Sequence, residues 1–294
     1  MSLPILLAAT DISASSRFTA QRAAMLAEQI GAKLEFVHVL DKRELDELQR
    51  LLGEDGEVLK ERIRLQTREL LAQLANDVGE PLGVSAGCHL VEGEVLESIT
   101  AQVDVLNASL LIVGAHGTGF VRQQLLGATA ERLLRVTQCP VLTVKQSPLK
   151  KYQNVLVPID FTPWSLSAIR LALTVVPQAK LTLLHAYEVP FEDQMRMAGE
   201  SEESIRRYRD KIRQEVGARL YQTAMDAGIT EVNWRPVVLH GNAVQRILEQ
   251  EEEQGADLVV LGKHGHGMVE ELLLGSNTRR ILTHAQCDVL IANR

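Results

Sequence analysis

The stretch GAHGTGFVRQQLLGATAERLLRVTQCPVL, residues 114–142, returns 148 positions later as GKHGHGMVEELLLGSNTRRILTHAQCDVL, residues 262–290. Fourteen of the 29 aligned positions are identical, including four glycines and one cysteine. Self-similarity at a fixed separation is the signature of a repeated structural unit. The sequence therefore predicts one fold written twice in tandem.

The similarity continues upstream of this stretch with small shifts. The aligned positions set Asp11 beside Asp160 and His38 beside His185. The matching segments are ILLAATDIS (5–13) with VLVPIDFT (155–162), EFVHVL (35–40) with TLLHAY (182–187), and EGEVLESI (92–99) with HGNAVQRIL (240–248).

The segment KQSPLKKYQ (145–153) between the copies is short, polar and basic, a composition typical of a linker. A chain of 294 residues suggests two domains at roughly 150 residues each. We expect one domain over residues 1–146 and a second over residues 152–294.

The composition of the chain limits the classes of function that are expected for it. The net charge is −7 and no long basic run occurs, so nucleic-acid and anionic-membrane binding are not expected. No apolar run approaches the roughly 18 residues of a membrane span, and the N-terminal segment lacks the pattern of a signal peptide. A cytoplasmic protein is expected. The three cysteines show no CxxC spacing and are interpreted as small buried hydrophobes. The acidic run Glu249–Glu253 is interpreted as a solvated helix end.

Short apolar runs alternate with amphipathic segments in both copies, which predicts two doubly wound, Rossmann-like α/β domains, each with a five-stranded parallel sheet flanked by helices. Ser13 is the expected N-cap of the first helix, and a helical break is expected near Gly53. Strands are expected at 3–9, 34–40, 84–91, 109–113 and 141–145, and again near 154–159, 180–187, 232–239, 257–261 and 288–292.

In the second copy, a glycine-rich loop follows the strand that ends near Gly262. Gly262 and Gly265 come first, and nine residues later Gly275-Ser276-Asn277 opens a helix. Free N–H groups and the positive dipole at a helix start favour a phosphate, and glycine permits close approach of an anion. Ser276 adds a hydroxyl donor and Lys263 a positive charge.

Asp160 also follows a strand end, so the fold brings it to the same crevice, where it suits a ribose hydroxyl or an amine. The loop is neither a Walker A motif nor the GxGxxG dinucleotide motif. A purely structural role for these glycines, in turning and close packing, remains open from the residues alone.

These residues resemble the universal stress protein family in its tandem, two-domain form, with one family domain per half. The resemblance rests on G-x2-G-x9-G-(S/T) and on the strand ends Pro158-x-Asp160 and His185-Ala186. It implies an adenine-nucleotide alpha hydrolase-like fold and binding of ATP, with Mg²⁺. The implied site residues are Pro158, Asp160 and Ala186 around the adenosine and Gly262, Gly265, Gly275, Ser276 and Asn277 around the phosphates.

The first copy departs from this motif, because Ala128 stands where Ser or Thr is expected. Its spacing survives, and Thr129 is the nearest hydroxyl. A second candidate nucleotide site therefore comprises Asp11, Val39, Gly114, Gly117, Gly127 and Thr129.

No catalytic constellation and no metal-ligand set is recognised. The loop histidines lack a carboxylate or cysteine partner at ligand spacing. The leading hypothesis is a nucleotide-binding stress-response module. A slow ATPase or nucleotide-dependent enzyme and a nucleotide-free protein-interaction scaffold stay open. The apolar terminal strands, 141–145 and 289–292, are predicted to pair within the chain as an intramolecular pseudo-dimer, and further homodimerisation and protein partners are left open.

Overall fold

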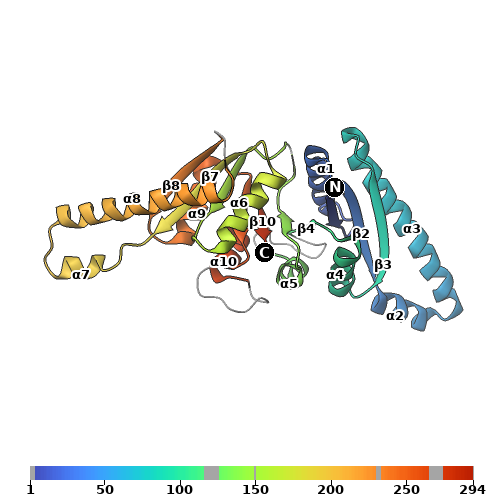
Figure 1. Cartoon of the computed structure of the whole chain (residues 1–294). Coiled ribbons are helices and arrows are strands. Elements are labelled where there is room, and N and C mark those ends of the chain that lie inside the picture. The colour runs from blue at the N-terminus through green and yellow to red at the C-terminus, as the bar shows by residue number, and fades with distance from the viewer. Residues whose placement is uncertain (1–3, 116–125, 149, 230–232, 265–273, 294) are drawn as a thin grey trace. The chain divides into compact units, whose positions relative to one another are not determined.

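The computed structural model describes residues 4–115, 126–148, 150–229, 233–264 and 274–293. The chain divides into two compact units. Unit 1 comprises Met1–Lys151 together with Asp288–Asn293, and unit 2 comprises Tyr152–Cys287. Figure 1 shows helices on both faces of the sheet in each unit.

Unit 1 contains five parallel strands in the order β3-β2-β1-β4-β5. Helices α1 and α3 cover one face of this sheet, and α4 and α5 cover the other. The elements are β1 (Ile5–Ala9), α1 (Ser16–Ile30), β2 (Lys33–Asp41), α2 (Lys42–Leu52), α3 (Glu54–Gly79), the 3-10 helix η1 (Glu80–Leu82), β3 (Ala86–Gly93), α4 (Val95–Leu106), β4 (Leu110–Gly114), α5 (Ala128–Val136) and β5 (Val141–Val144).

Unit 2 repeats the arrangement with parallel strands in the order β9-β6-β7-β8. Helices α6 and α8 cover one face, and α9 and α10 the other. The elements are β6 (Asn154–Pro158), α6 (Pro163–Val175), β7 (Lys180–Tyr187), α7 (Glu192–Met197), α8 (Glu202–Asp226), β8 (Trp234–His240), α9 (Ala243–Gln254), β9 (Leu258–Gly262) and α10 (Ser276–His284).

The central strands carry the core of each unit. Their apolar runs are buried on both faces because helices cover the sheet on each side. In unit 1, Leu7, Ala8 and Leu111 are fully buried, and in unit 2 the same holds for Leu156 and Val259. The predicted doubly wound α/β fold is confirmed, and so is the helical break at Gly53, whose φ of 59° separates α2 from α3. The sequence predicts five parallel strands in each copy, whereas unit 2 contains four among its described residues, because the strand at 288–292 groups with unit 1.

The last strand, β10 (Asp288–Ala292), groups with unit 1 and runs antiparallel to β5. Val289 lies opposite Thr143, and Ile291 lies opposite Val141. The predicted pairing of the two terminal strands is therefore present. The pseudo-dimeric arrangement of the two copies stays a prediction, as do the domain boundaries 1–146 and 152–294.

Several local expectations need correction. Helix α1 starts at Ser16 with Ser15 as its N-cap, although the Ser13 hydroxyl does accept the Ser16 N–H at 3.2 Å. Glu251 is buried rather than solvated, because its carboxylate accepts the backbone N–H groups of Gln286 (2.7 Å) and Cys287 (2.8 Å).

Of the three cysteines interpreted as buried hydrophobes, one is buried. Cys287 is buried, Cys139 is half-buried and Cys88 is exposed on the edge strand β3. Among the described helices, none combines the length and the apolar character that crossing a bilayer requires.

Candidate functional site

A cavity of about 260 Å³ lies at the carboxyl ends of β6 and β9. Strand β6 is the point where strand order reverses in unit 2, since β7 lies on one side of it and β9 on the other. Ligands of doubly wound sheets bind at such points. The lining residues are Pro158, Ile159, Asp160, Trp164, Ser165, Leu184, Ala243, Ile247, Leu261, Gly262, His264, Gly275, Ser276, Asn277, Thr278 and Ile281.

One wall of this cavity is the start of α10. Its N-cap is Gly275, which has no side chain to accept the N–H groups of the first turn. The neighbouring helix α9 is different, because the Asn242 side chain accepts the Gln245 N–H there. First-turn N–H groups have no acceptor within a helix, and among the residues that the structure describes none accepts those of Ser276 and Asn277, which can therefore reach an anion in the cavity.

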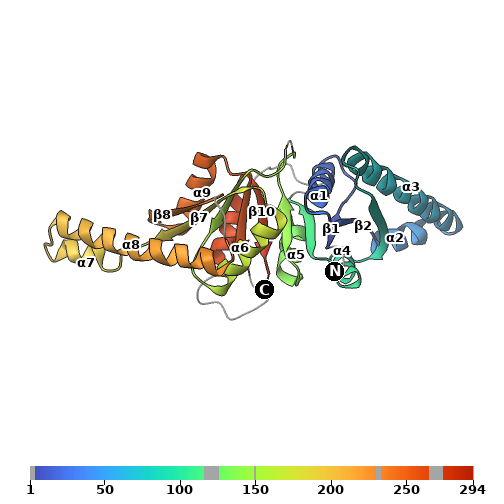
Figure 2. The same ribbon diagram turned by 45° about the horizontal axis from the view of Figure 1, so that its top comes forward.

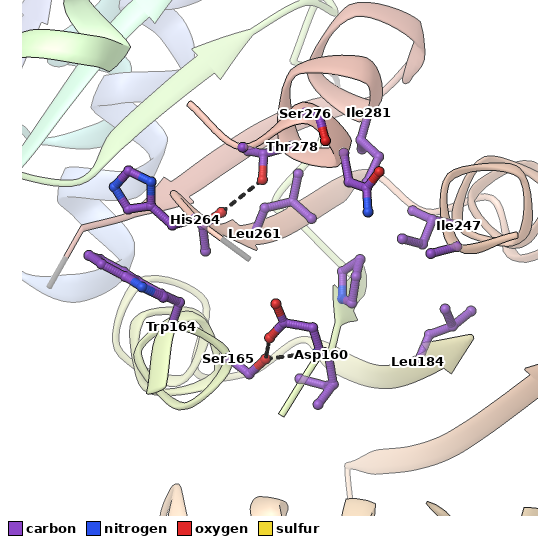
Figure 3. Close-up of a pocket in the computed structure, with 16 residues that line it drawn as sticks. Asp160, Trp164, Ser165, Leu184, Ile247, Leu261, His264, Ser276, Thr278 and Ile281 are labelled. Atoms are coloured by element: carbon purple, nitrogen blue, oxygen red, sulfur yellow. Dashed lines mark hydrogen bonds between the residues drawn. The ribbon is translucent and has the colours of Figure 1, made fainter. Parts of the chain in front are cut away.

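The opposite wall carries Asp160 (Figure 3). Its Oδ1 accepts three hydrogen bonds, from the Thr162 N–H (3.0 Å), the Thr162 hydroxyl (2.6 Å) and the Ser165 hydroxyl (2.7 Å). These bonds fix the carboxylate, and none of the described hydrogen bonds reaches its Oδ2. Asp160 is therefore an acceptor held in a fixed orientation, suited to hydroxyl or amine donors of a ligand.

The backbone beyond this aspartate is left-handed in both units. Phe161 has φ 62°, and Ile12, at the equivalent position after Asp11, has φ 60°. A left-handed conformation is costly for a bulky or β-branched residue. Strained backbone of this kind clusters at functional sites, where the surrounding structure maintains it. The same strain at the same position in both copies marks this turn as part of the site.

Close packing sets the third side of the cavity. A β-carbon on Gly262 would lie 2.6 Å from Cβ of Trp164, so the glycine allows α6 to approach the end of β9. The Thr278 hydroxyl donates to the Gly262 carbonyl at 3.1 Å and ties α10 to the same point. The Trp164 ring packs edge-on against that of His264, with centroids 4.8 Å apart. Gly262 therefore has a structural role in close packing, the alternative that the residues alone left open.

The structure brings together six of the eight predicted nucleotide-site residues, namely Pro158, Asp160, Gly262, Gly275, Ser276 and Asn277. Gly265 lies outside the described residues. Ala186 borders a neighbouring cavity, described below, instead of this one. Lys263, suggested as a charge for the phosphates, is buried and does not line the cavity.

Sequence reasoning missed Trp164, Thr278 and Ile247. The spacing of the glycine motif carries no signal for them, because they reach the cavity from α6, from the interior face of α10 and from α9. Figure 3 shows that these three side chains come from three separate segments around the cavity.

The neighbouring cavity, of about 560 Å³, lies over the carboxyl end of β7 and shares Ala243 with the first. Its lining residues are His185, Ala186, Tyr187, Glu188, Pro190, Tyr208, Ile212, Val216, Gly241 and Ala243. Burial raises the pKa of the Tyr187 hydroxyl there, and nearby Arg213 and Arg209 oppose that shift.

Unit 1 has a cavity of about 440 Å³ at the corresponding place, where β1 lies between β2 and β4. Five of the six predicted residues line it, namely Asp11, Val39, Gly114, Gly127 and Thr129. Gly117 lies outside the described residues. Gly127 is the N-cap of α5 as Gly275 is of α10, and Ala128 lines the cavity in place of the hydroxyl residue.

The strand-end histidines have a structural hydrogen bond in each unit. Nδ1 of His38 lies 2.7 Å from the Thr10 carbonyl, and Nδ1 of His185 lies 2.6 Å from the Ile159 carbonyl. Within the described ranges, no three His, Cys, Asp or Glu side chains gather as a metal site.

Known proteins share this architecture. The model of the universal stress protein family matches residues 4–145 and again residues 151–293. A universal stress protein of Mycobacterium tuberculosis is 23% identical over 234 residues, which are 77% of this chain and 77% of that protein. Universal stress protein A homolog 1 of Coxiella burnetii is 31% identical over 144 residues, 47% of this chain and 94% of that protein.

A solved structure shows the same fold along the whole length. The crystal structure of a universal stress protein from Archaeoglobus fulgidus superimposes with a TM-score of 0.68, covering 99% of this chain and 98% of that one at 20% identity. With a family match in each half of its sequence, the chain belongs to the universal stress protein family.

Proposed function

We propose that this protein is an ATP-binding module of the stress response whose working site is the cavity of unit 2. One observation carries the proposal. Asp160 lies about 100 residues before the glycine-rich segment in the sequence, yet it lines one cavity with Gly262, Gly275 and Ser276 at the point where strand order reverses. A fixed carboxylate faces an uncapped helix start across this cavity, which suits a ligand with hydroxyls at one end and phosphates at the other.

The fit of ATP follows from the charges of the two walls. The first turn of α10 offers N–H groups and the positive end of the helix dipole, so the phosphates belong there. The carboxylate of Asp160 repels phosphate and attracts hydroxyls, so the ribose belongs at that wall. Gly275, Ser276 and Asn277, with Gly265, would hold the phosphates, while Asp160 and Ala186 would hold the adenosine. Mg²⁺ would neutralise part of the phosphate charge.

The test is calorimetric titration of Mg-ATP into nucleotide-stripped protein. We expect one ATP per chain. Gly275→Val places a branched side chain at the N-cap of α10 and should abolish this binding, and Ser276→Ala should weaken it. Gly127→Val makes the same change at the N-cap of α5 in unit 1 and is the matched control.

A second readout assigns the site to unit 2. The chain has two tryptophans, and only Trp164 lines the cavity, so Trp234→Phe leaves a single reporter. ATP should then change the Trp164 fluorescence. If Gly127→Val abolishes binding and Gly275→Val does not, the working site lies in unit 1. If the wild-type protein gives no heat of binding at millimolar ATP, nucleotide binding is rejected.

A further inference from the structure

Helix α3 of unit 1 exposes apolar side chains on its outer face. In both views this helix borders the outside of unit 1, with the strands on its other side (Figure 1, Figure 2). Two large apolar side chains lie on the outer face, since Val58 is 62% exposed and Leu65 is 51% exposed. The inner face packs within unit 1 through buried residues, namely Leu71, Leu74, Ala75 and Val78.

The apolar residues of the outer face are seven positions apart. Val58, Leu65 and Ala72 are all exposed, and residues at this spacing lie close to one line along a helix. At a rise of 1.5 Å per residue the line is about 21 Å long. Apolar residues at this spacing are typical of helices that pack side by side along their length.

Each flank of this apolar line carries one acidic and one basic residue, and their order is opposite on the two flanks. On one flank Glu61 lies four positions before Leu65, and Arg68 lies three positions after it. On the other flank Arg62 lies three positions before Leu65, and Glu69 lies four positions after it. All four charged residues are exposed. The charge of each flank therefore changes sign at Leu65.

Contacts within the chain use few of these charges. Arg62, Arg68 and Glu69 form no ion pair with any residue that the structure describes. Glu61 lies 3.0 Å from Arg64 of the same helix, and both side chains keep contact with solvent. Pairing within α3 therefore does not account for the pattern.

A second copy of α3 would complement these charges. When two antiparallel helices are related by a two-fold axis, the same flank of each copy meets, and the order of residues along it is reversed. With the axis at Leu65, Glu61 faces Arg68 of the second copy, and Arg62 faces Glu69 of the second copy. Each pair occurs twice. A parallel arrangement would instead place Glu61 against Glu61 and Arg68 against Arg68, so the charges favour the antiparallel one.

We propose that the outer face of α3 is an interface between two copies of this chain, in which α3 packs antiparallel on its counterpart around Leu65. The partner is a second copy because an isologous contact needs a surface that is complementary to itself, and the charges around Leu65 have this property. Interfaces of less than about 1,200 Å² belong to weak or transient complexes, and a contact made by one helix pair belongs to this class. The dimer therefore forms at micromolar concentrations and dissociates on dilution.

Sedimentation velocity of the full-length protein, from about 1 to 300 µM, measures this association. We expect the average mass to rise from that of one chain, 32.5 kDa, towards twice that value. Leu65→Lys should weaken the dimer by about tenfold or more, because it brings two positive charges together at the centre of the contact. Leu70→Lys is the matched control, since Leu70 is also exposed but lies about 140° away around the same helix.

An exchange of charges tests the antiparallel arrangement and leaves the apolar residues intact. Glu61→Arg sets this arginine against Arg68 of the second copy and should weaken the dimer about tenfold at low salt, where charges are screened least. Combining Glu61→Arg with Arg68→Glu exchanges the two charges on one flank and should restore wild-type association. A folding defect caused by the first substitution would not be repaired in this way.

A wild-type protein that keeps the mass of one chain at the highest concentration would overturn the proposal. A dimer that Leu65→Lys leaves unchanged would also overturn it, because that dimer must form through a different surface. If Glu61→Arg weakens the dimer and the added Arg68→Glu does not restore it, the antiparallel pairing is wrong.

Discussion

A β-carbon on Gly262 would lie 2.6 Å from Cβ of Trp164 and 3.3 Å from the tryptophan's backbone carbonyl. The end of β9 and the start of α6 are therefore in contact at the one position where β9 has no side chain. Both residues line the cavity of unit 2, so the packing that stabilises the unit also shapes the site.

Gly262→Ala should lower the free energy of unfolding by about 1–3 kcal/mol, because the neighbouring atom belongs to the helix and cannot swing away. Urea denaturation followed by far-UV circular dichroism measures this. Gly217→Ala is the control, since Gly217 lies within α8 with open space around it and alanine there should stabilise by about 0.5–1 kcal/mol. Equal effects of the two substitutions would contradict the packing argument.

Ile12→Asn should raise the free energy of unfolding by about 0.5–1 kcal/mol. Ile12 has φ 60°, and asparagine tolerates this conformation much better than a β-branched residue does. The same substitution at Phe161 should destabilise, because its ring lies 4.4 Å from that of His185 and under Arg219. The midpoint of thermal unfolding is measured for the two variants and the wild type. A shift of both midpoints in the same direction would contradict the prediction.

Asp288→Asn should destabilise by about 3–5 kcal/mol, because it leaves a buried guanidinium without its charge partner. Oδ2 of Asp288 lies 3.3 Å from Nε of Arg22, and its Oδ1 accepts the Lys145 N–H at 2.7 Å. The side chains are 1% and 6% exposed.

The matched control for this buried pair is Asp77→Asn, which breaks the exposed pair with Arg17 and should cost less than about 1 kcal/mol. Both are measured by urea denaturation. If Asp288→Asn unfolds at the same midpoint as Asp77→Asn, the buried pair does not hold β10 on unit 1.

Alkylation of Cys139 by iodoacetamide should be slow at pH 8 and rise steeply towards pH 11. Burial raises the pKa of this thiol to about 11, whereas an unfolded cysteine titrates near about 8.5, and the thiolate is the reactive form. The associated stability is present below about pH 8.5 and is lost as the pH rises through the folded pKa. Peptide mass spectrometry gives the rate for each cysteine, and equal rates in native and urea-unfolded protein at pH 8 would contradict the prediction.

The fold was readable from the sequence because its signal is local and repeated. Apolar runs of strand length alternate with amphipathic segments in each half, and a parallel doubly wound sheet is the arrangement that buries such runs on both faces. Three residues that the sequence places at strand or helix ends, Asp160, Gly262 and Gly275, line the cavity of unit 2.

The burial of individual side chains was harder to predict from the sequence. Glu251 precedes two further glutamates and looks solvated, yet it is buried because its carboxylate accepts the backbone N–H groups of Gln286 and Cys287. Periodicity reports which face of a helix is apolar, and it carries no information about backbone donors that arrive from elsewhere.

The sequence by itself determined the repeat, the α/β class and the spacing of the glycine-rich loop, because each depends on residue type and spacing within a short segment. Only the tertiary structure decided that Ala186 borders a second cavity, that Trp164 and Thr278 surround Gly262, and that Tyr208 presents a ring from α8. These relationships join segments far apart in the chain. Their distances depend on how closely helices and strands pack, which is set by all the side chains between them.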